Sequence, residues 1–71
     1  MSITQLQKGA EAVIKAVSGP DDIRHQLQEL GFTPGSRISL VAQGPFRGPK
    51  AFSIRGTTIA LREEEAACVH I

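Results

Sequence analysis

The sequence predicts a small, mainly β domain, a barrel of five to six short strands with one inserted α-helix at about residues 20–30. Its 71 residues suffice for a single domain spanning 1–71. Gly and Pro recur at intervals of about 10 residues, as in small all-β barrels, and several segments alternate between apolar and polar residues, as half-buried strands do. Because short strands bury little as an open sheet, closure into a barrel removes their exposed edges.

The first strand is predicted at 10–17, "AEAVIKAV", where Ala12, Ile14 and Ala16 share the inward face. Gly19 and Pro20 end it.

The helix is predicted from "PDDIRHQLQELG", residues 20–31. Proline is tolerated in a first helical turn, and two aspartates place negative charge near the positive end of the helix dipole. Gly31 can adopt the left-handed conformation that closes a helix. The apolar residues at i, i+4 and i+7, which would face the sheet, are Ile23, Leu27 and Leu30.

The rest of the chain is predicted as strands joined by tight turns. "TPGS" at 33–36 has Pro and Gly where a turn requires them, Gly56 and Thr57 form a second reversal, and "EEEAA" at 63–67 forms one helical turn. The strands are expected at 36–43, 50–55, 58–62 and 67–71, with Ile38, Leu40, Ala42, Phe52, Ile54, Val69 and Ile71 directed inward.

Composition excludes several classes of protein. Cys68 is the only cysteine, so no internal disulfide can form and a cytoplasmic location is expected. No apolar run approaches the length of a signal peptide or the roughly 20 residues of a membrane span, so no direct membrane insertion is expected. The net charge is +1, the cations are scattered, and Trp and Tyr are absent, so nucleic acid is not an expected partner.

Catalysis is not expected either, and no cofactor or catalytic residue is predicted. Cys68, His25 and His70 could in principle supply a nucleophile and a base. However, a core this small leaves little room for the roughly 300 Å³ that a substrate pocket needs. No phosphate-binding loop, HExxH or serine elbow is present.

Two residue pairs are weak candidates for a metal site. Cys68 and His70 are two apart on the predicted last strand and would share a face. His25 and Glu29 stand at i, i+4 on the helix. Each pair supplies two ligands, whereas a stable site needs about four, or three plus water. The ligand count therefore favours an exposed strand end and a solvated helix face, with no bound metal.

The loop "GPFRGPK" at 44–50 contains an aromatic residue and two cationic residues, which a turn alone does not require. Phe46, Arg47 and Lys50 are candidate partner-binding residues, because aromatic and Arg side chains often carry interface energy and prolines stiffen the loop before docking. The alternative is that Phe46 folds back over the barrel mouth. Arg24 and the polar face of the helix form a second candidate patch.

The order of these segments resembles the ferrous iron transport protein A (FeoA) family. The resemblance rests on "LGFTPGSRISLV" at 30–41 followed by "GPFRGPKAFSIRGTTIALREEEA" at 44–66, and it covers nearly the whole chain. It implies an SH3-like domain without catalytic activity, accessory to the ferrous iron permease FeoB. Many members have Gly-Asp-Pro in the loop, where this chain has Arg47, Gly48 and Pro49, so the acidic residue is missing.

The expected function is therefore regulatory. The chain would bind the cytoplasmic GTPase part of a FeoB-type permease, modulate its activity, and lie at the inner face of the cell membrane through that partner. Two alternatives stay open: a metal-sensing SH3-like domain related to the C-terminal domain of iron-dependent repressors, and a small nucleic-acid-binding barrel. Weak homo-oligomerisation is also left open.

Overall fold

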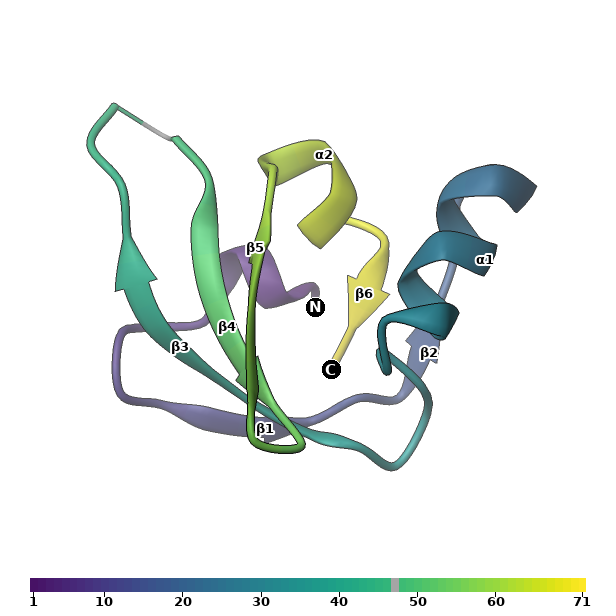
Figure 1. Cartoon of the computed structure of the whole chain (residues 1–71), viewed down its shortest axis with the longest axis horizontal. Coiled ribbons are helices and arrows are strands. Elements are labelled where there is room, and N and C mark those ends of the chain that lie inside the picture. Colours follow the sequence, from purple (N-terminus) through teal and green to yellow (C-terminus); the bar gives the residue numbers. More distant parts are fainter. Residues whose placement is uncertain (47) are drawn as a thin grey trace.

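Six short strands, one helix of nine residues and two single helical turns make up the described part of the chain, residues 1–46 and 48–71, in the computed structural model (Figure 1). In chain order they are η1 (Ile3–Gln5, a 3-10 turn), β1 (Glu11–Val13), β2 (Ala16–Val17), α1 (Asp21–Glu29), β3 (Arg37–Gln43), β4 (Lys50–Ile54), β5 (Thr57–Leu61), α2 (Glu63–Ala66) and β6 (Val69–His70). The predicted mainly β architecture with one inserted helix is confirmed.

The strands form two antiparallel sheets, one with the order β1-β3-β4-β5 and the other with β2-β6. The single strand predicted at 10–17 is wrong, because the chain leaves one sheet for the other at its middle. The N–H of Ile14 donates to the carbonyl of Ser36 at 2.9 Å, and the next N–H, that of Lys15, donates to His70 at 2.7 Å. The break also changes which side chains of β2 face the core. Ala16, predicted to face inward, is exposed, and Val17 is half-buried.

The core is apolar and draws on nearly every element. Its buried members are Ile3, Ile14, Leu27, Phe32, Ile38, Leu40, Phe52, Ile54, Leu61, Ala66 and Val69. They include all but two of the residues predicted to face inward from the last four strands, the two being Ile71 and Ala42. Ile71, just after β6, is half-buried and packs against the core. Ala42 does not face the core, because a bulge lies between Leu40 and Ala42. The extra residue reverses the alternation, so Ala42 is exposed.

The end of helix α1 is set by Gly31, as predicted. Gly31 has φ +105, its N–H donates to Gln28 at 3.1 Å, and the next N–H, of Phe32, donates to Leu27 at 3.0 Å. This pair of bonds is a Schellman closure, which brings the residue after the glycine back against the helix. Phe32 is wholly buried as a result, whereas Leu30, predicted to face the sheet, is 41% exposed.

Two tight turns set the geometry of the strands. In the predicted 33–36 turn, Gly35 has φ +90 and the N–H of Ser36 donates to Thr33 at 3.1 Å. The β4–β5 hairpin turns one residue earlier than predicted, at Arg55 and Gly56, which both have positive φ. Such two-residue turns match the twist of paired strands.

The two ends of the described chain meet beside β6. The N–H of Ile71 donates to the carbonyl of Met1 at 2.8 Å, and Ser2 forms an isolated bridge with His70. Figure 1 shows the termini next to each other. No helix within 1–46 and 48–71 is both long and apolar enough to cross a membrane.

Candidate protein-interaction surface

The loop between β3 and β4 extends beyond the sheet at one corner of the molecule (Figure 1). Its limbs are held together by backbone hydrogen bonds from Gly44 to Pro49 at 3.3 Å and from Gly48 to Pro45 at 3.0 Å. A Cβ on Gly44 would lie 3.2 Å from the Pro49 carbonyl oxygen, and one on Gly48 would lie 3.1 Å from that of Pro45. A side chain at either position would therefore require the opposite limb to move by a few tenths of an ångström.

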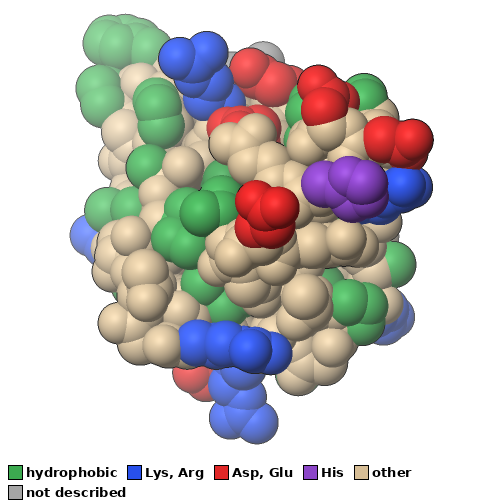
Figure 2. Space-filling model, turned by 45° about the vertical axis from the view of Figure 1, so that its right-hand side comes forward, with side chains coloured by type: hydrophobic (Ala, Val, Ile, Leu, Met, Phe, Trp, Pro, Cys, Tyr) green, Lys and Arg blue, Asp and Glu red, His purple; other side chains and the backbone are tan. Residues whose placement is uncertain are grey.

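Phe46 stands at the tip of this loop and is 100% exposed, whereas Phe32 and Phe52 are both 0% exposed. Its φ of +55 is unusual for a residue with a side chain and costs roughly 1–2 kcal/mol. Figure 2 shows hydrophobic side chains gathered at the upper corner where this loop lies. Of the two arrangements that the sequence left open, the structure has the one in which Phe46 points into solvent. Arg47, the second candidate, lies outside the described residues.

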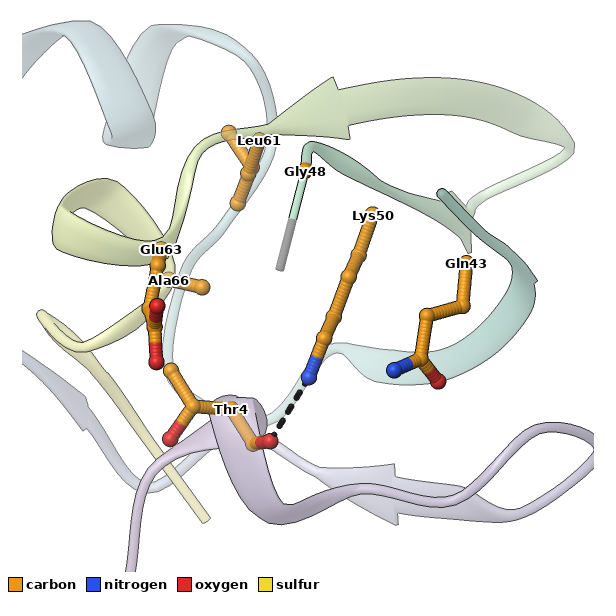
Figure 3. A pocket seen from close by; sticks show the side chains of 7 residues that line it. All are labelled: Thr4, Gln43, Gly48, Lys50, Leu61, Glu63 and Ala66. Atoms are coloured by element: carbon orange, nitrogen blue, oxygen red, sulfur yellow. Dashed lines mark hydrogen bonds between the residues drawn. The ribbon is translucent and has the colours of Figure 1, made fainter. Parts of the chain in front are cut away.

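Lys50, the third loop candidate, is directed away from the loop tip. It is half-buried, and its Nζ donates to the carbonyl oxygen of Thr4 at 2.9 Å, which ties β4 to η1 (Figure 3). The side chain crosses a pocket of about 320 Å³ between the foot of the loop, α2 and η1. The residues that line it are Thr4, Gln43, Gly48, Lys50, Leu61, Glu63 and Ala66.

A second hollow of about 240 Å³ adjoins the first, since Gly48 and Glu63 line both. Pro49, Arg62 and Glu64 complete it. The position of α2 beside the foot of the loop was not predicted from the sequence. No local signal could have found it, because α2 and the loop foot are separated in the chain by the β4–β5 hairpin.

Arg24 lies on α1, on the other side of the molecule from the loop (Figure 1). Its Nη2 donates to Asp21 Oδ1 at 2.7 Å, in an exposed pair one turn apart. The structure therefore does not bring the two candidate patches together. Six of the seven acidic residues lie on the helices, three on α1 and three on α2. Figure 2 accordingly shows acidic side chains gathered at the end of this face where the helices lie.

The metal candidates do not assemble into one site. His25 and Glu29 are both exposed on α1. Cys68 and His70 were predicted to lie on one strand, but Cys68 precedes β6. Within 1–46 and 48–71, no three His, Cys, Asp or Glu side chains gather as a metal site would require.

Cys68 and His70 each have a partner within the chain. Cys68 Sγ donates to the Glu64 carbonyl at 3.4 Å, and His70 Nε2 lies 2.7 Å from Ser18 Oγ. These contacts join the last segment to α2 and to the segment after β2, a structural role.

A small SH3-like β-barrel with a loop that has an exposed aromatic residue at its tip is the class of protein that this fold and surface define. The family model of the FeoA domain matches residues 1–71, the whole chain. The chain belongs to the FeoA domain family, as the sequence predicted.

Three relatives show how far the likeness extends. A Fe(2+) transport protein A/Fe(2+) transporter FeoB fusion protein of Porphyromonas gingivalis is 34% identical over all 71 residues, and the chain spans 8% of that protein's length. The crystal structure of Stenotrophomonas maltophilia FeoA complexed with zinc has 34% identity and a TM-score of 0.86, covering 97% of this chain and 86% of the other. The solution structure of iron(II) transport protein A from Clostridium thermocellum has 30% identity and a TM-score of 0.93, covering 99% of this chain and 43% of the other.

The fold alone is also shared with a manganese-dependent transcriptional repressor, at 17% identity and a TM-score of 0.87. The chain is thus a member of a small accessory-domain family associated with ferrous iron transport, and that family is not a known enzyme family.

Proposed function

We propose that this chain is a non-enzymatic regulator of ferrous iron uptake, which binds the cytoplasmic GTPase part of a FeoB-type permease and modulates its activity. One observation carries the choice of partner: in the Porphyromonas gingivalis relative, a segment like this chain shares a polypeptide with FeoB. Covalent linkage keeps two modules at high effective concentration, which suits modules that must meet. The proposed location is therefore cytoplasmic, at the inner face of the membrane.

The proposed contact is the β3–β4 loop, with Phe46 as its anchor. A fully exposed phenylalanine leaves apolar surface in water that a partner pocket could cover. The backbone bonds between the loop limbs restrict its conformations before binding, so less entropy is lost on docking. Buried aromatic anchors near the centre of an interface are typical hot spots.

Lys50 supports this contact indirectly. Because its ammonium group is bonded to the carbonyl of Thr4, it fixes the foot of the loop relative to η1. The neighbouring hollow has two carboxylates, of Glu63 and Glu64, against the single guanidinium of Arg62, so the flank of the loop is acidic on balance. The surface thus suits a partner that offers an apolar pocket with a basic or polar rim.

Regulation requires that the chain distinguish the nucleotide states of the permease. A ligand with equal affinity for two conformations shifts neither, however tightly it binds. We therefore propose that the pocket for Phe46 is open in only one of the nucleotide states.

The test is titration calorimetry of the isolated cytoplasmic domain of the cognate permease, in its GDP state and with a non-hydrolysable GTP analogue. Phe46→Ala is expected to weaken binding by about 30-fold or more, the effect of a hot spot worth at least about 2 kcal/mol. Val13→Ala is the matched control, since Val13 is 50% exposed on β1. Binding that is equal for wild type and Phe46→Ala would exclude the loop, and no binding in either state would exclude the partner.

A further inference from the structure

One edge of the larger sheet is open. β5 pairs with β4 on one side only, and β5 ends the strand order. The two-residue turn makes Ile54 and Thr57 a hydrogen-bonded pair, so the alternation of an antiparallel ladder makes Phe52 and Ile59 the next one. The N–H and C=O groups of the residues between, Thr58 and Ala60, therefore point away from β4.

These edge groups have no partner within the described residues: no hydrogen bond found in 1–46 and 48–71 joins Thr58 or Ala60 to anything beyond β4. Both side chains are exposed as well. Because buried unpaired backbone groups are rare, these groups face water.

Proteins usually blunt such an edge with charge, proline, a bulge or short length. β5 has none of these devices, since its five residues, "TTIAL", are uncharged and pair with β4 in unbroken register. The opposite edge strand, β1, has only three residues and begins with Glu11, and Lys15 lies two residues after its end. β6 is covered by its bridge to Ser2.

We propose that β5 pairs antiparallel with β5 of a second copy of this chain, around a two-fold axis at Ile59. In this register Thr58 lies opposite Ala60 of the second copy, and Ala60 lies opposite its Thr58. These are the residues whose backbone groups are free, so each pair exchanges both N–H···O bonds. The two sheets become one continuous sheet, and Ile59 meets its own symmetry mate. The open edge is thus complementary to itself.

Charge and space at the ends of the strand favour a second copy over an unrelated extended segment. In the same register, Arg62 of one copy lies opposite Gly56 of the other, and a Cβ on Gly56 would meet nothing within 4 Å. The β4–β5 turn with Arg55 comes next to the start of α2, where Glu63 is exposed. Arg55 Nη2 donates to Ser36 Oγ at 3.0 Å and to Thr33 Oγ1 at 3.4 Å, and no carboxylate within 1–46 and 48–71 forms an ion pair with this side chain. By symmetry, the turn with Arg55 of one copy therefore lies near the exposed Glu63 of the other at both ends of the paired strands.

The dimer is weak and reversible, because only five residues of each chain pair. The surface area that these residues bury is smaller than the roughly 1,200 Å² that a stable interface buries. Phe46 takes no part in the pairing, since its loop joins β3 to β4, whereas the second copy pairs with the side of β5 that faces away from β4.

The first test is sedimentation equilibrium up to about 1 mM protein, in the range of weak transient interfaces. Ala60→Pro removes an outward N–H from each copy without touching the ladder to β4, since proline is tolerated on sheet edges. It is expected to raise the dimer dissociation constant at least about fivefold, through two lost hydrogen bonds, with an unchanged circular dichroism spectrum. Phe46→Ala is the control and should dimerise like wild type. A monomer at every concentration, or a dimer abolished by Phe46→Ala instead, overturns the proposal.

The second test reads the register and does not depend on proline. In a Cys68→Ser background, Thr58→Cys protein is mixed with Ala60→Cys protein under oxidised glutathione. The proposed pairing separates these Cα atoms by about 5.5 Å, within disulfide reach, while each variant alone places its cysteines at a diagonal of about 7–8 Å. Crosslinks are expected in the mixture and at most a few per cent as much in either variant alone. Equal crosslinking in all three samples, or none in the mixture, overturns the register.

Discussion

Truncating Phe52 to alanine should destabilise the protein strongly, whereas truncating Phe46 should leave its stability unchanged. Phe52 is 0% exposed on β4, where it pairs with Leu40 and Ile59. Removing a buried phenylalanine costs about 3–5 kcal/mol through lost transfer energy and the cavity left behind. A chain of 71 residues has a free energy of unfolding of about 4–11 kcal/mol. Phe52→Ala should therefore remove about a quarter or more of the stability, or unfold the protein.

Phe46→Ala should leave stability within about 0.5 kcal/mol of wild type, because a side chain that is 100% exposed contributes no burial. Relief of the positive φ is not expected, since alanine also disfavours it.

Urea and thermal unfolding, followed by circular dichroism, measure both effects. In a domain of this size 1 kcal/mol shifts the Tm by about 4–8 °C, so Phe52→Ala should lower it by at least about 12 °C. A loss of more than about 1.5 kcal/mol for Phe46→Ala, or under about 1.5 kcal/mol for Phe52→Ala, would refute the assignment of these side chains to surface and core.

Three further expectations can be checked with the same unfolding assays. Gly31→Ala should lower the free energy of unfolding by about 1–3 kcal/mol through its positive φ alone, since the added Cβ would meet nothing within 4 Å. Gly19→Ala should lower it by more, because the added Cβ would lie 2.7 Å from Cys68 Sγ. Adding Cys68→Ala should remove that excess; an unchanged difference would contradict the clash. Lys50→Ala should cost about 1 kcal/mol by freeing the carbonyl of Thr4, and no loss would show that this bond contributes nothing. One equivalent of Fe²⁺ or Zn²⁺ should leave the Tm unchanged, because no three ligand side chains gather in 1–46 or 48–71, and a rise of several degrees would contradict this.

Local signals predicted the helix and its end correctly. The aspartates after Pro20 and the glycine at Gly31 act on neighbouring residues, so the sequence holds all the information. The turn at 33–36 is of the same kind, because Gly35 supplies the positive φ that it needs.

Features that depend on distant pairing could not be predicted. The strand at 10–17 divides because two successive N–H groups bond to residues 36 and 70, far apart in the chain. Ala42 is exposed because a bulge arises against β4, and alternation alone assumes there is no bulge. Lys50 was expected at the surface, but its acceptor, Thr4, lies 46 residues away.

The loop was recognised from its composition, yet composition could not give the direction of Phe46. Alternation assigns Phe52 to the core, whereas a loop between Gly/Pro pairs has no period from which to read a face. The left-handed conformation of Phe46 lies within a turn closed by the hydrogen bond from Gly48 to Pro45, and few residues with side chains adopt it.

The hydrogen bond between Ile71 and Met1 has a topological consequence. Any polypeptide that continues from either end would leave the domain at a single point, beside β6. The domain can therefore be appended to a longer protein, or set into one as a side lobe, without strain on the barrel. A linker attached there would leave both the tip of the β3–β4 loop and the open edge of β5 accessible to other molecules.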